Sequence, residues 1–339
     1  MKKNIIFSAI FILFIFSIFF IFLKIKKEEK NEQLKLALIA DMHKCLPFSP
    51  EIEKDGLLND FTTDVETEKA DAIINLGDLL SYRVGKCHET AEIDLRQTVD
   101  YFSNKNFPFL NVLGDHDIDN SSSFDFWLRT NRLKSSYYSI ELKNFKIIIL
   151  DTATGGEGTQ NRCSEDENCQ ELKTQYELYR DILKDQEKFD NFSKKNNISR
   201  ERLEWEKDRR KDSYFREEKN IRNSRSFDRG KISLLQLDWL RNELEKTKKE
   251  KVIIISHHPL FRLDTGEKIY EIDNAGEVQK ILKESGKKII AVSGDAHIWH
   301  EEERDGIKYF VINRLSNNQG SWAFLEWNKN GVHLEKIGH

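Results

Sequence analysis

The chain has 339 residues, a hydrophobic content of 38% and a formal net charge of −4. This length and content are enough to bury a substantial core in one large or two ordinary domains. The nearly balanced charge gives no global sign of a nucleic-acid-binding protein, and 4 prolines are too few for a proline-rich linker.

The N-terminus carries the longest apolar run. After Lys2 and Lys3, an uncharged run extends from Ile5 to Leu23, and the lysine-rich residues 24–30 follow it. At about 1.5 Å per residue, the run can cross a hydrocarbon core of roughly 30 Å, and no small-residue cleavage site follows it. We expect residues 1–30 to be an uncleaved signal anchor, a transmembrane helix that holds an extracytoplasmic catalytic domain. A cleaved signal, which would make the protein secreted, and a cytosolic core helix are the alternatives, and lysines at both ends leave the orientation open.

Short runs rich in Ile, Val and Leu recur along the rest of the chain, each bounded by polar residues or glycine. This pattern is typical of strands that are buried on both faces of a sheet. Helical patterns lie between several of them, at residues 90–106 and 233–250. Alternating strands and helices predict an α/β fold built in layers. The runs are Leu34–Ala40, Asp71–Gly77, Phe107–Gly114, Phe145–Leu150, Lys251–Ser256 and Lys287–Gly294.

Further apolar runs follow near the C-terminus, at residues 308–313, 321–327 and 332–337. The sequence Asn-Lys-Asn-Gly at residues 328–331 has the composition of a hairpin turn between the last two runs. Because these strands follow one another without a helical pattern, we expect them to form a second, more antiparallel sheet.

Residues 155–230 break the rhythm of strands and helices. They contain no buried-strand run and consist mainly of charged helix formers with scattered aromatic residues. The segment is too long for an ordinary loop. We therefore predict a helical insertion within a single domain that spans residues 31–339. The insertion follows a strand end, so it is either a cap over the polar strand ends or a solvated segment without a function.

The chain has 4 cysteines, an even number that is consistent with two disulfides outside the cytoplasm. Cys163 and Cys169 are close enough in sequence to close a small ring in a polar loop. Cys45 and Cys87 each follow shortly after a strand-ending motif, so they could meet across neighbouring loops. Unpaired thiols at all these positions are the alternative.

Most of the predicted strands end in acidic residues, histidines or both. In open α/β sheets, the loops at the carboxyl ends of the strands gather around one crevice. Carboxylates gathered there without cations would raise one another's pKa values and destabilise the fold. Bound divalent metals would remove this difficulty, and Asp and His are ligands that Zn²⁺, Mn²⁺ and iron accept. The residues at these ends are Asp41, His43, Asp78, Asp115, His116, Asp117, His257, His258, Asp295 and His297.

The series Asp-x-His, Gly-Asp, Gly-(Asn/Asp)-His-Asp, His-x-Pro and Gly-x-x-His resembles the calcineurin-like metallophosphoesterase family. The resemblance covers roughly residues 34–152 and 230–339. It implies an α/β fold, a four-layer α/β/β/α sandwich of two mixed sheets, with two divalent metal ions at the strand ends. It also implies hydrolysis of a phosphomonoester or a small phosphodiester by a hydroxide that bridges the two metals.

Motif by motif, the resemblance implies a role for each of these residues. Asp78 would bridge the two metals. His116 would protonate the leaving group and Asp117 would orient it. His257 matches the family's ligand better than His258, because that ligand stands two residues before a proline. The first metal would be held by Asp41, His43 and His297, and the second by Asp115, His257 and Asp295.

Two positions depart from the usual family pattern. Asp115 stands where asparagine is commoner, and Asp295 stands where histidine is commoner; both belong to the second metal. Four carboxylates against two divalent ions bring the centre close to neutrality, so we expect a weaker attraction for phosphate unless the insertion brings in arginines. The metals would come from the group of Mn, Fe, Zn, Mg and Ca, with the second site shifted towards the harder ions.

Three other functions stay open. A purple acid phosphatase places a tyrosine ligand three residues after its bridging Asp, whereas Ser81 occupies that spacing here and Tyr82 lies one residue further on. Trp205, Tyr214 and Phe215, which lie near basic residues of the insertion, would suit a nuclease that acts on single-stranded nucleic acid. The third is a non-catalytic binding module on the same fold, although every ligand position retains a side chain that can bind a metal.

Overall fold

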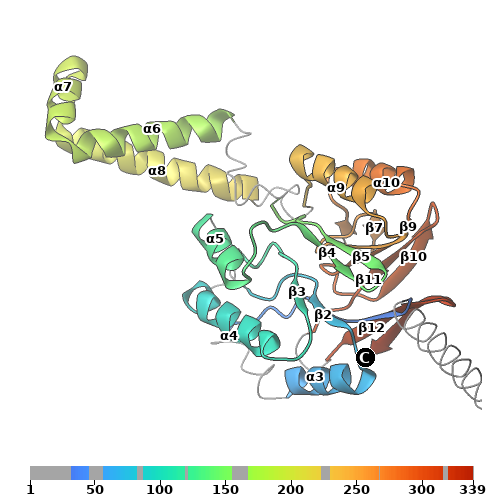
Figure 1. The fold of residues 1–339 in the computed structure, drawn as a ribbon. Coiled ribbons are helices and arrows are strands. Elements are labelled where there is room, and N and C mark those ends of the chain that lie inside the picture. The colour runs from blue at the N-terminus through green and yellow to red at the C-terminus, as the bar shows by residue number, and fades with distance from the viewer. Residues whose placement is uncertain are drawn as a thin grey trace, which may run out of the picture.

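Two large sheets lie face to face in the middle of the protein, and helices cover their outer faces (Figure 1). Helices α9 (Leu234–Lys246) and α10 (Ala275–Glu284) lie on one outer face. Helices α3 (Leu57–Glu68), α4 (Ala91–Ser103) and α5 (Ser121–Thr130) lie on the other. The layers thus follow the order helix, sheet, sheet, helix. The computed structural model describes residues 32–45, 56–81, 87–118, 121–154, 167–222, 230–266, 268–315 and 320–338.

The first sheet has its strands in the order β13-β12-β1-β2-β3. β1, β2 and β3 are parallel to one another, and β12 pairs antiparallel with both β1 and β13. The predicted hairpin turn is confirmed, because Asn328 and Gly331 are register partners at its base. The strands are β1 (Leu34–Ile39), β2 (Ala72–Asn75), β3 (Phe109–Asn111), β12 (Trp322–Asn328) and β13 (Gly331–Ile337).

The second sheet has the order β10-β11-β9-β6-β5-β4. Its inner strands are parallel, and the strand at each edge pairs antiparallel with its neighbour. The strands are β4 (Tyr138–Leu142), β5 (Phe145–Ile149), β6 (Lys251–Ile255), β9 (Lys288–Ser293), β10 (His300–Arg304) and β11 (Ile307–Val311). A separate hairpin joins β7 (Leu263–Asp264) to β8 (Ile269–Tyr270).

The expected mixed α/β fold with two large sheets is confirmed, and each buried-strand run of the sequence contains a strand. The expectation that the C-terminal strands form a sheet of their own was wrong. β12 and β13 extend the first sheet beside β1, whereas β11 is parallel to β9 in the second sheet. The physical reason is that β1 is almost entirely buried, so its backbone needs a hydrogen-bonding partner on each side.

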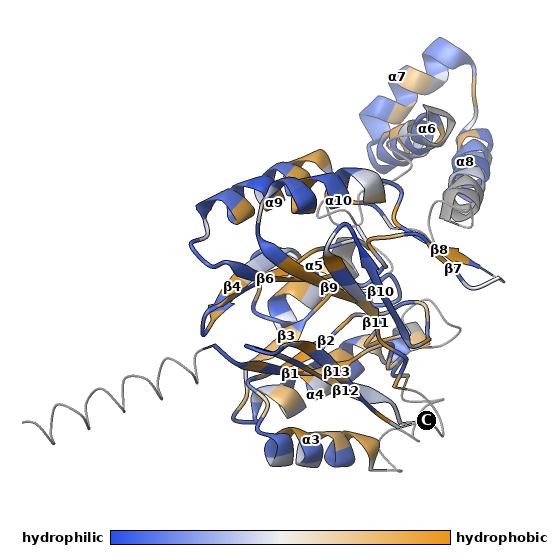
Figure 2. Cartoon of the chain, turned by 90° about the vertical axis from the view of Figure 1, so that its right-hand side faces the viewer, coloured by the Kyte–Doolittle hydropathy of each residue, from blue (hydrophilic) through white to orange (hydrophobic). Residues whose placement is uncertain are grey.

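Alternating side chains of the central strands supply the cores between the layers (Figure 2). In β1, Leu36 and Leu38 point into the core between the sheets, while Ala37 and Ile39 point towards α3 and α4. β6 does the same in the second sheet, where alternate residues pack against α9 and α10. Strand side chains alternate between faces with a period of two, so a continuous apolar run can serve two cores at once.

Helix α9 is fixed to the sheet by its cap and by one buried amide. Ser233 caps it by accepting a hydrogen bond from the backbone N–H of Gln236. The side chain of Gln236 is fully buried and pairs with both backbone groups of Asp151, at distances of 2.9 Å. The end of β5 and the start of α9 are therefore held together close to the strand ends.

Helices α6 (Glu167–Lys184), α7 (Gln186–Asn196) and α8 (Arg200–Arg222) lie within the predicted insertion and extend away from the sheets (Figure 1). They pack on one another through a small apolar cluster centred on Ile182, Phe189 and Leu203. The guanidinium groups of Arg202 and Arg209 lie 4.2 and 5.2 Å from the ring of Trp205. Tyr214 is buried, and the side chain of Phe215 lies outside the described residues. Two predictions about the insertion are not tested: that it interrupts a single domain, and that it caps the strand ends.

The predicted membrane anchor at residues 1–30 lies outside the described residues. No helix within the described ranges has both the length and the apolar character needed to cross a membrane. Tyr82, which the purple acid phosphatase alternative requires, also lies outside these ranges. Its neighbour Ser81 is described, and its hydroxyl donates to the backbone oxygen of His43.

The expected pairing of Cys45 with Cys87 is confirmed by a disulfide, with the two Cα atoms 5.2 Å apart. The disulfide joins the loop after β1 to the short helix η1 (Cys87–Glu89). Lys44 and Leu80 form a parallel bridge beside it, so the loops that follow β1 and β2 are fastened together. Cys163 and the side chain of Cys169 lie outside the described residues.

Candidate metal centre

The loops after β1, β2, β3, β6 and β9 meet at one end of the two sheets. Their acidic and imidazole side chains form overlapping groups whose nitrogen and oxygen atoms lie within 4.8 Å of one another. The structure thus brings together all the residues predicted as metal ligands, and it adds His258. The groups are Asp41, His43 and His297; Asp41, Asp78 and His257; His43, Asp78 and His116; and Asp115, His257, His258 and Asp295.

The backbone at this centre is strained. Half of the non-glycine residues with positive φ among the described residues belong to it. A left-handed backbone is costly for residues with a Cβ and persists where the surrounding structure enforces it. In each Asp-x-His motif both residues adopt it. Asp41 and His43 thereby join the same group, whereas Asp295 and His297 reach different groups of the centre. The residues are Asp41 (φ 53°), His43 (φ 47°), Asp78 (φ 52°), Asp295 (φ 63°) and His297 (φ 55°).

Two glycines allow the loops to approach this closely. A Cβ added at Gly114 would lie 2.1 Å from Asp78 Oδ1, and one at Gly77 would lie 2.5 Å from His257 Nδ1. Gly77 also has a φ of 101°, which a side chain disfavours. The glycines that precede Asp78 and Asp115 in sequence are therefore required by the packing of the centre.

The first group, formed by Asp41, His43 and His297, has the spacing of ligands around one ion. His43 Nε2 lies 3.3 Å from His297 Nε2, and His297 Nε2 lies 3.4 Å from Asp41 Oδ1. Ligands held tetrahedrally at about 2.1 Å from one metal are about 3.4 Å from each other, whereas N–H···O hydrogen bonds are centred near 2.9 Å. Asp41 Oδ1 is also buried and makes no hydrogen bond within the described part of the chain. These atoms fit a shared cation better than a hydrogen-bonded network.

The Asp78 carboxylate faces the first group and also the second group, which consists of Asp115, His257, His258 and Asp295. Its Oδ2 lies 3.7 Å from His43 Nε2, and its Oδ1 lies 3.4 Å from His257 Nε2. The backbone N–H of His116 donates to Oδ1 at 2.9 Å and holds the carboxylate in this orientation. A carboxylate with one oxygen turned to each group has the geometry of a ligand that two ions share.

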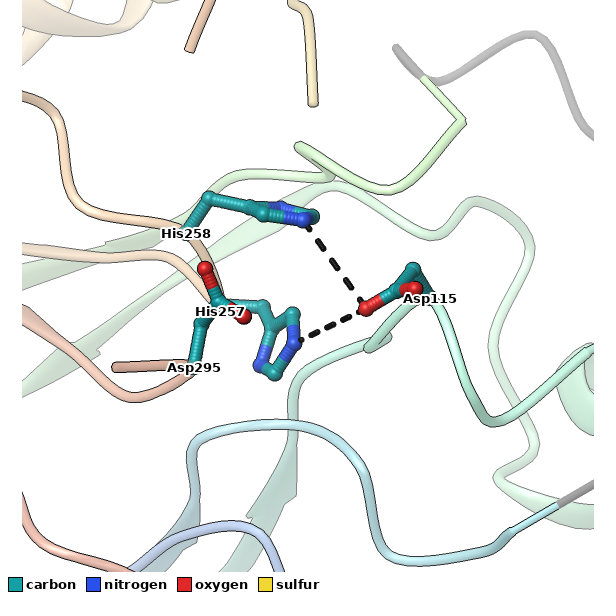
Figure 3. A group of neighbouring side chains, drawn as sticks. All are labelled: Asp115, His257, His258 and Asp295. Carbon is teal, nitrogen blue, oxygen red and sulfur yellow. Dashed lines mark ion pairs between the residues drawn. The ribbon is translucent and has the colours of Figure 1, made fainter. Parts of the chain in front are cut away.

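The second group combines two histidines and two carboxylates (Figure 3). His257 Nε2 lies 3.3 Å from Asp115 Oδ1, and His258 Nε2 lies 3.9 Å from the same oxygen. His257 Nδ1 donates to the backbone oxygen of Leu76 at 3.0 Å, which leaves the Nε2 lone pair facing the carboxylates. His257 Nε2 is buried and has no hydrogen-bond partner among the described residues, as a metal ligand would.

His258 is the residue that sequence reasoning left out of the ligand set. The resemblance favours His257 over it, because the family's ligand stands two residues before a proline. Both histidines follow the last residue of β6, where side chains need not alternate between opposite faces, so both can turn to the centre. The side chain of Thr152 fixes the His258 ring, with Oγ1 2.9 Å from Nδ1. The doubled histidine was the only signal in the sequence.

Burial of so many charged groups shifts their pKa values strongly. Burial raises the pKa of Asp78 well above its usual value and that of Asp295 to about 7, and neighbouring carboxylates add to both shifts. Burial also lowers the pKa of His43 to about 4. The pKa of His257 is raised well above its usual range, because the attraction of Asp78 and Asp115 outweighs the effect of burial. Divalent cations would stabilise the carboxylates in their charged form, so the donor set fits such ions.

The two predicted catalytic residues lie beside these groups. The His116 side chain is 35% exposed, and its Nε2 lies 3.9 Å from Asp115 Oδ2. Both oxygens of Asp117 accept backbone hydrogen bonds, from Leu80 at 2.9 Å and from Gly114 at 2.8 Å. Asp117 thus fastens the loop after β3 to the loop after β2. Its action on His116, and the individual metal roles, stay predictions.

Two stacked mixed sheets whose strand ends gather carboxylates and imidazoles define a class of metal-dependent hydrolases. The family model for calcineurin-like phosphoesterases matches residues 34–299, and the chain therefore belongs to the calcineurin-like phosphoesterase family. The protein is accordingly a hydrolase that acts on phosphoric ester bonds, and it carries candidate ligand clusters for the two divalent metals that dimetal members of the family use.

Among solved structures, a dimetal phosphatase from Danio rerio shares this fold. It is 15% identical, with 90% of this chain and 98% of that chain covered and a TM-score of 0.56. GAP50, described as the anchor in the inner membrane complex of Plasmodium, is 10% identical, with coverages of 90% and 84% and a TM-score of 0.47. A search of curated proteins found no match.

Proposed function

We propose that the protein hydrolyses a phosphomonoester or a small phosphodiester at a two-metal centre, at a membrane surface. The observation that carries the catalytic part is the position of Asp78, whose two oxygens face His43 and His257 at 3.7 and 3.4 Å. A bridging carboxylate between two groups of ligands supports a pair of ions held close together, as in-line displacement at phosphorus requires.

The residues divide between the two ions as the family resemblance implies. When bound, the ions would lower the pKa of a shared water and neutralise charge on the phosphate oxygens. The backbone N–H of His116 and the Leu76 carbonyl orient Asp78 and His257 for this task. Asp41, His43 and His297 hold the first ion, Asp115, His257 and Asp295 hold the second, and Asp78 belongs to both.

His116 is the proposed proton donor to the leaving group. Its imidazole is partly exposed, and it meets the His43 ring edge to face at a centroid distance of 5.0 Å. It can therefore reach a substrate that enters from solvent. General-acid assistance of this kind typically contributes about 10²–10⁴-fold to the rate.

The proposed location is the outer surface of a membrane. The uncharged run from Ile5 to Leu23 supports anchoring. The disulfide between Cys45 and Cys87 supports an oxidising compartment, because such bonds are rare in the cytosol. The catalytic domain would then act outside the cytoplasm, and a cleaved N-terminus would release it as a secreted enzyme.

The test uses the purified full chain in detergent, freed of metal and then supplied with Mn²⁺, Zn²⁺, Mg²⁺ or Ca²⁺. Aryl phosphate monoesters and diesters report turnover. We expect chelation to abolish turnover, Asp78→Asn to lower kcat by at least about 10³-fold, and His116→Gln to lower it by about 10²–10⁴-fold. The matched control is Asp238→Asn, an exposed carboxylate on α9.

Four results would count against the proposal. Turnover that survives chelation, or that is unchanged in Asp78→Asn, would refute the two-metal centre. The absence of turnover with every metal and both ester types would favour a non-catalytic binding module. A preference for single-stranded nucleic acid over small esters would favour the nuclease alternative.

A further inference from the structure

The end of the sheets opposite the metal centre is rich in lysine. The segment Lys246–Lys251 carries four lysines and one glutamate, and Lys287 and Lys288 begin the next strand of the same sheet. Lys251 and Lys288 are register partners at the starts of β6 and β9. We call this surface the lysine face and define it as Lys246, Lys248, Lys249, Lys251, Lys287 and Lys288.

Several of these lysines line a surface cavity of about 660 Å³. Lys246, Lys248 and Lys288 are exposed and have no ion pair among the described residues. Three glutamates line the same cavity and offset part of the charge of the six lysines: Glu32, Glu141, which lies 3.7 Å from Lys249, and Glu250. The face therefore keeps an excess of positive charge that is directed to solvent.

The lysine face is also where the described chain begins. Lys143 donates to the backbone oxygen of Gln33 at 2.8 Å, and Glu32 lines the cavity itself. The apolar run ends at Leu23, so nine residue-to-residue steps of no more than about 3.6 Å each separate it from Glu32. If the run lies in a bilayer, the lysine face cannot be further than about 30 Å from it.

The metal centre lies at the other end of the same strands. Lys251 begins β6 and His257 follows its end, and Lys288 begins β9 and Asp295 follows its end. At about 3.3 Å per residue, roughly 20 Å of strand separates the lysines from the ligands. Whatever covers the lysine face leaves the metal centre open on the opposite side.

We propose that the lysine face rests on an anionic lipid surface, so that the metal centre opens away from the bilayer and takes a water-soluble phosphoester. This rests on the membrane anchoring proposed above. Lysines near an anionic bilayer are attracted to it within about one Debye length. The geometry disfavours a lipid headgroup of the same bilayer as substrate.

The test compares the full chain reconstituted into vesicles of phosphatidylcholine with the full chain in vesicles that also contain phosphatidylglycerol. Lysines are acetylated briefly and quantified by mass spectrometry. In the anionic vesicles we expect acetylation of Lys246, Lys248 and Lys288 to be about fivefold slower than in the neutral vesicles. This ratio corresponds to the attraction of about 1 kcal/mol between one lysine and an anionic surface. High salt should restore the faster rate. Lys268, an exposed lysine whose charge acts on Asp295, is the internal control and should not change.

A charge-reversal variant separates the lysine face from general charge effects. Lys246→Glu, Lys248→Glu and Lys288→Glu together should abolish the protection of Lys249 and Lys251. The matched control reverses Lys194, Lys195 and Lys280, which are exposed on α7 and α10. The control should keep the protection, and both variants should keep turnover of soluble esters.

The outcomes distinguish this inference from the proposed function. Equal labelling in both kinds of vesicle, or protection of Lys268 instead, would overturn the lipid contact even if the enzyme is active. Protection that needs an acidic protein rather than anionic lipid would also overturn it. Extraction of the chain from vesicles by alkaline carbonate would refute the anchor, and turnover assayed in detergent reports the metal centre independently of both.

Discussion

Removing the metals should make the protein less stable as the pH rises from about 6.5 to about 8. The pKa of Asp295 is raised to about 7 by burial and by nearby carboxylates, and that of Asp78 is raised further above its usual value. The pKa of His257 is also raised, because Asp78 and Asp115 outweigh its burial. A group that binds its proton more tightly in the folded state contributes stability below its unfolded pKa and loses it as the pH rises through its folded pKa.

Two groups with lowered pKa values act in the opposite direction. Asp41 has finished adding stability by about pH 6.5, whereas His43, with a folded pKa of about 4, still adds about 0.4 kcal/mol over the window as its unfolded form loses its proton. Over the window, a carboxyl with a folded pKa of about 7, such as Asp295, loses about 0.8 kcal/mol of unfolding free energy. The raised pKa values of Asp78 and His257 act in the same direction as that of Asp295, so we expect a net loss of at least about 0.4 kcal/mol.

Thermal unfolding of the full chain in detergent measures this loss. In chelator, the Tm should fall by at least about 1 °C across the window, since 1 kcal/mol corresponds to about 2–4 °C in a domain of this size. With saturating Mn²⁺ the carboxylates stay ionised throughout, so the Tm should change little. Asp295→Asn should flatten the slope in chelator. A Tm in chelator that is constant or rises over the window would refute the assignment of the raised pKa values.

Three further predictions concern the charge, the packing and the disulfide. The double variant Asp115→Asn, Asp295→His should bind inorganic phosphate at least about tenfold more tightly and move the metal preference towards Zn²⁺; an unchanged inhibition constant and preference would contradict the charge count. Gly114→Ala should weaken metal binding in calorimetry by at least about 10²-fold, whereas Gly276→Ala, where an added Cβ meets nothing within 4 Å, should not. Cys87→Ser should lower the unfolding free energy in urea by about 4 kcal/mol, the chain-entropy value for a sequence separation of 42, and no change would show that the loops are held by other contacts.

The fold could be predicted as far as burial determines it. β1, β6 and β9 are buried on both faces, and their continuous apolar runs show this directly in the sequence. The sheet to which β12 and β13 belong could not be predicted. Pairing of β12 with β1 joins residues nearly 290 positions apart, such as Leu36 and Leu325. No local sequence pattern indicates with which strand β12 pairs.

The convergence of the site was predictable because the ligands follow parallel strands, whose carboxyl ends share one edge. The backbone conformation that directs these side chains towards one another could not be predicted. Asp41 and Asp295 adopt positive φ values of 53° and 63°, although nothing in an Asp residue itself requires this conformation. Only the packing of five loops around buried charges enforces it, and packing of that kind appears only in three dimensions.

The remaining ambiguity in the second group is which of two adjacent histidines binds the metal. His257 Nε2 lies closer to Asp115 Oδ1, at 3.3 Å against 3.9 Å for His258. The Leu76 carbonyl can only accept, so it fixes the proton of His257 on Nδ1, whereas the Thr152 hydroxyl can donate to His258 Nδ1 or accept from it.

In the neutral ring of His257, Nε2 must therefore carry the lone pair. In His258, either ring nitrogen can carry it. We expect His257→Asn to weaken Mn²⁺ binding by more than about 10²-fold and His258→Asn by about 10–10²-fold, as for a supporting residue. Titration against a fluorescent chelator measures both, with His333→Asn on β13 as the control. If His258→Asn is the more damaging change, the Thr152 hydroxyl must accept from Nδ1, and His258 is the ligand instead.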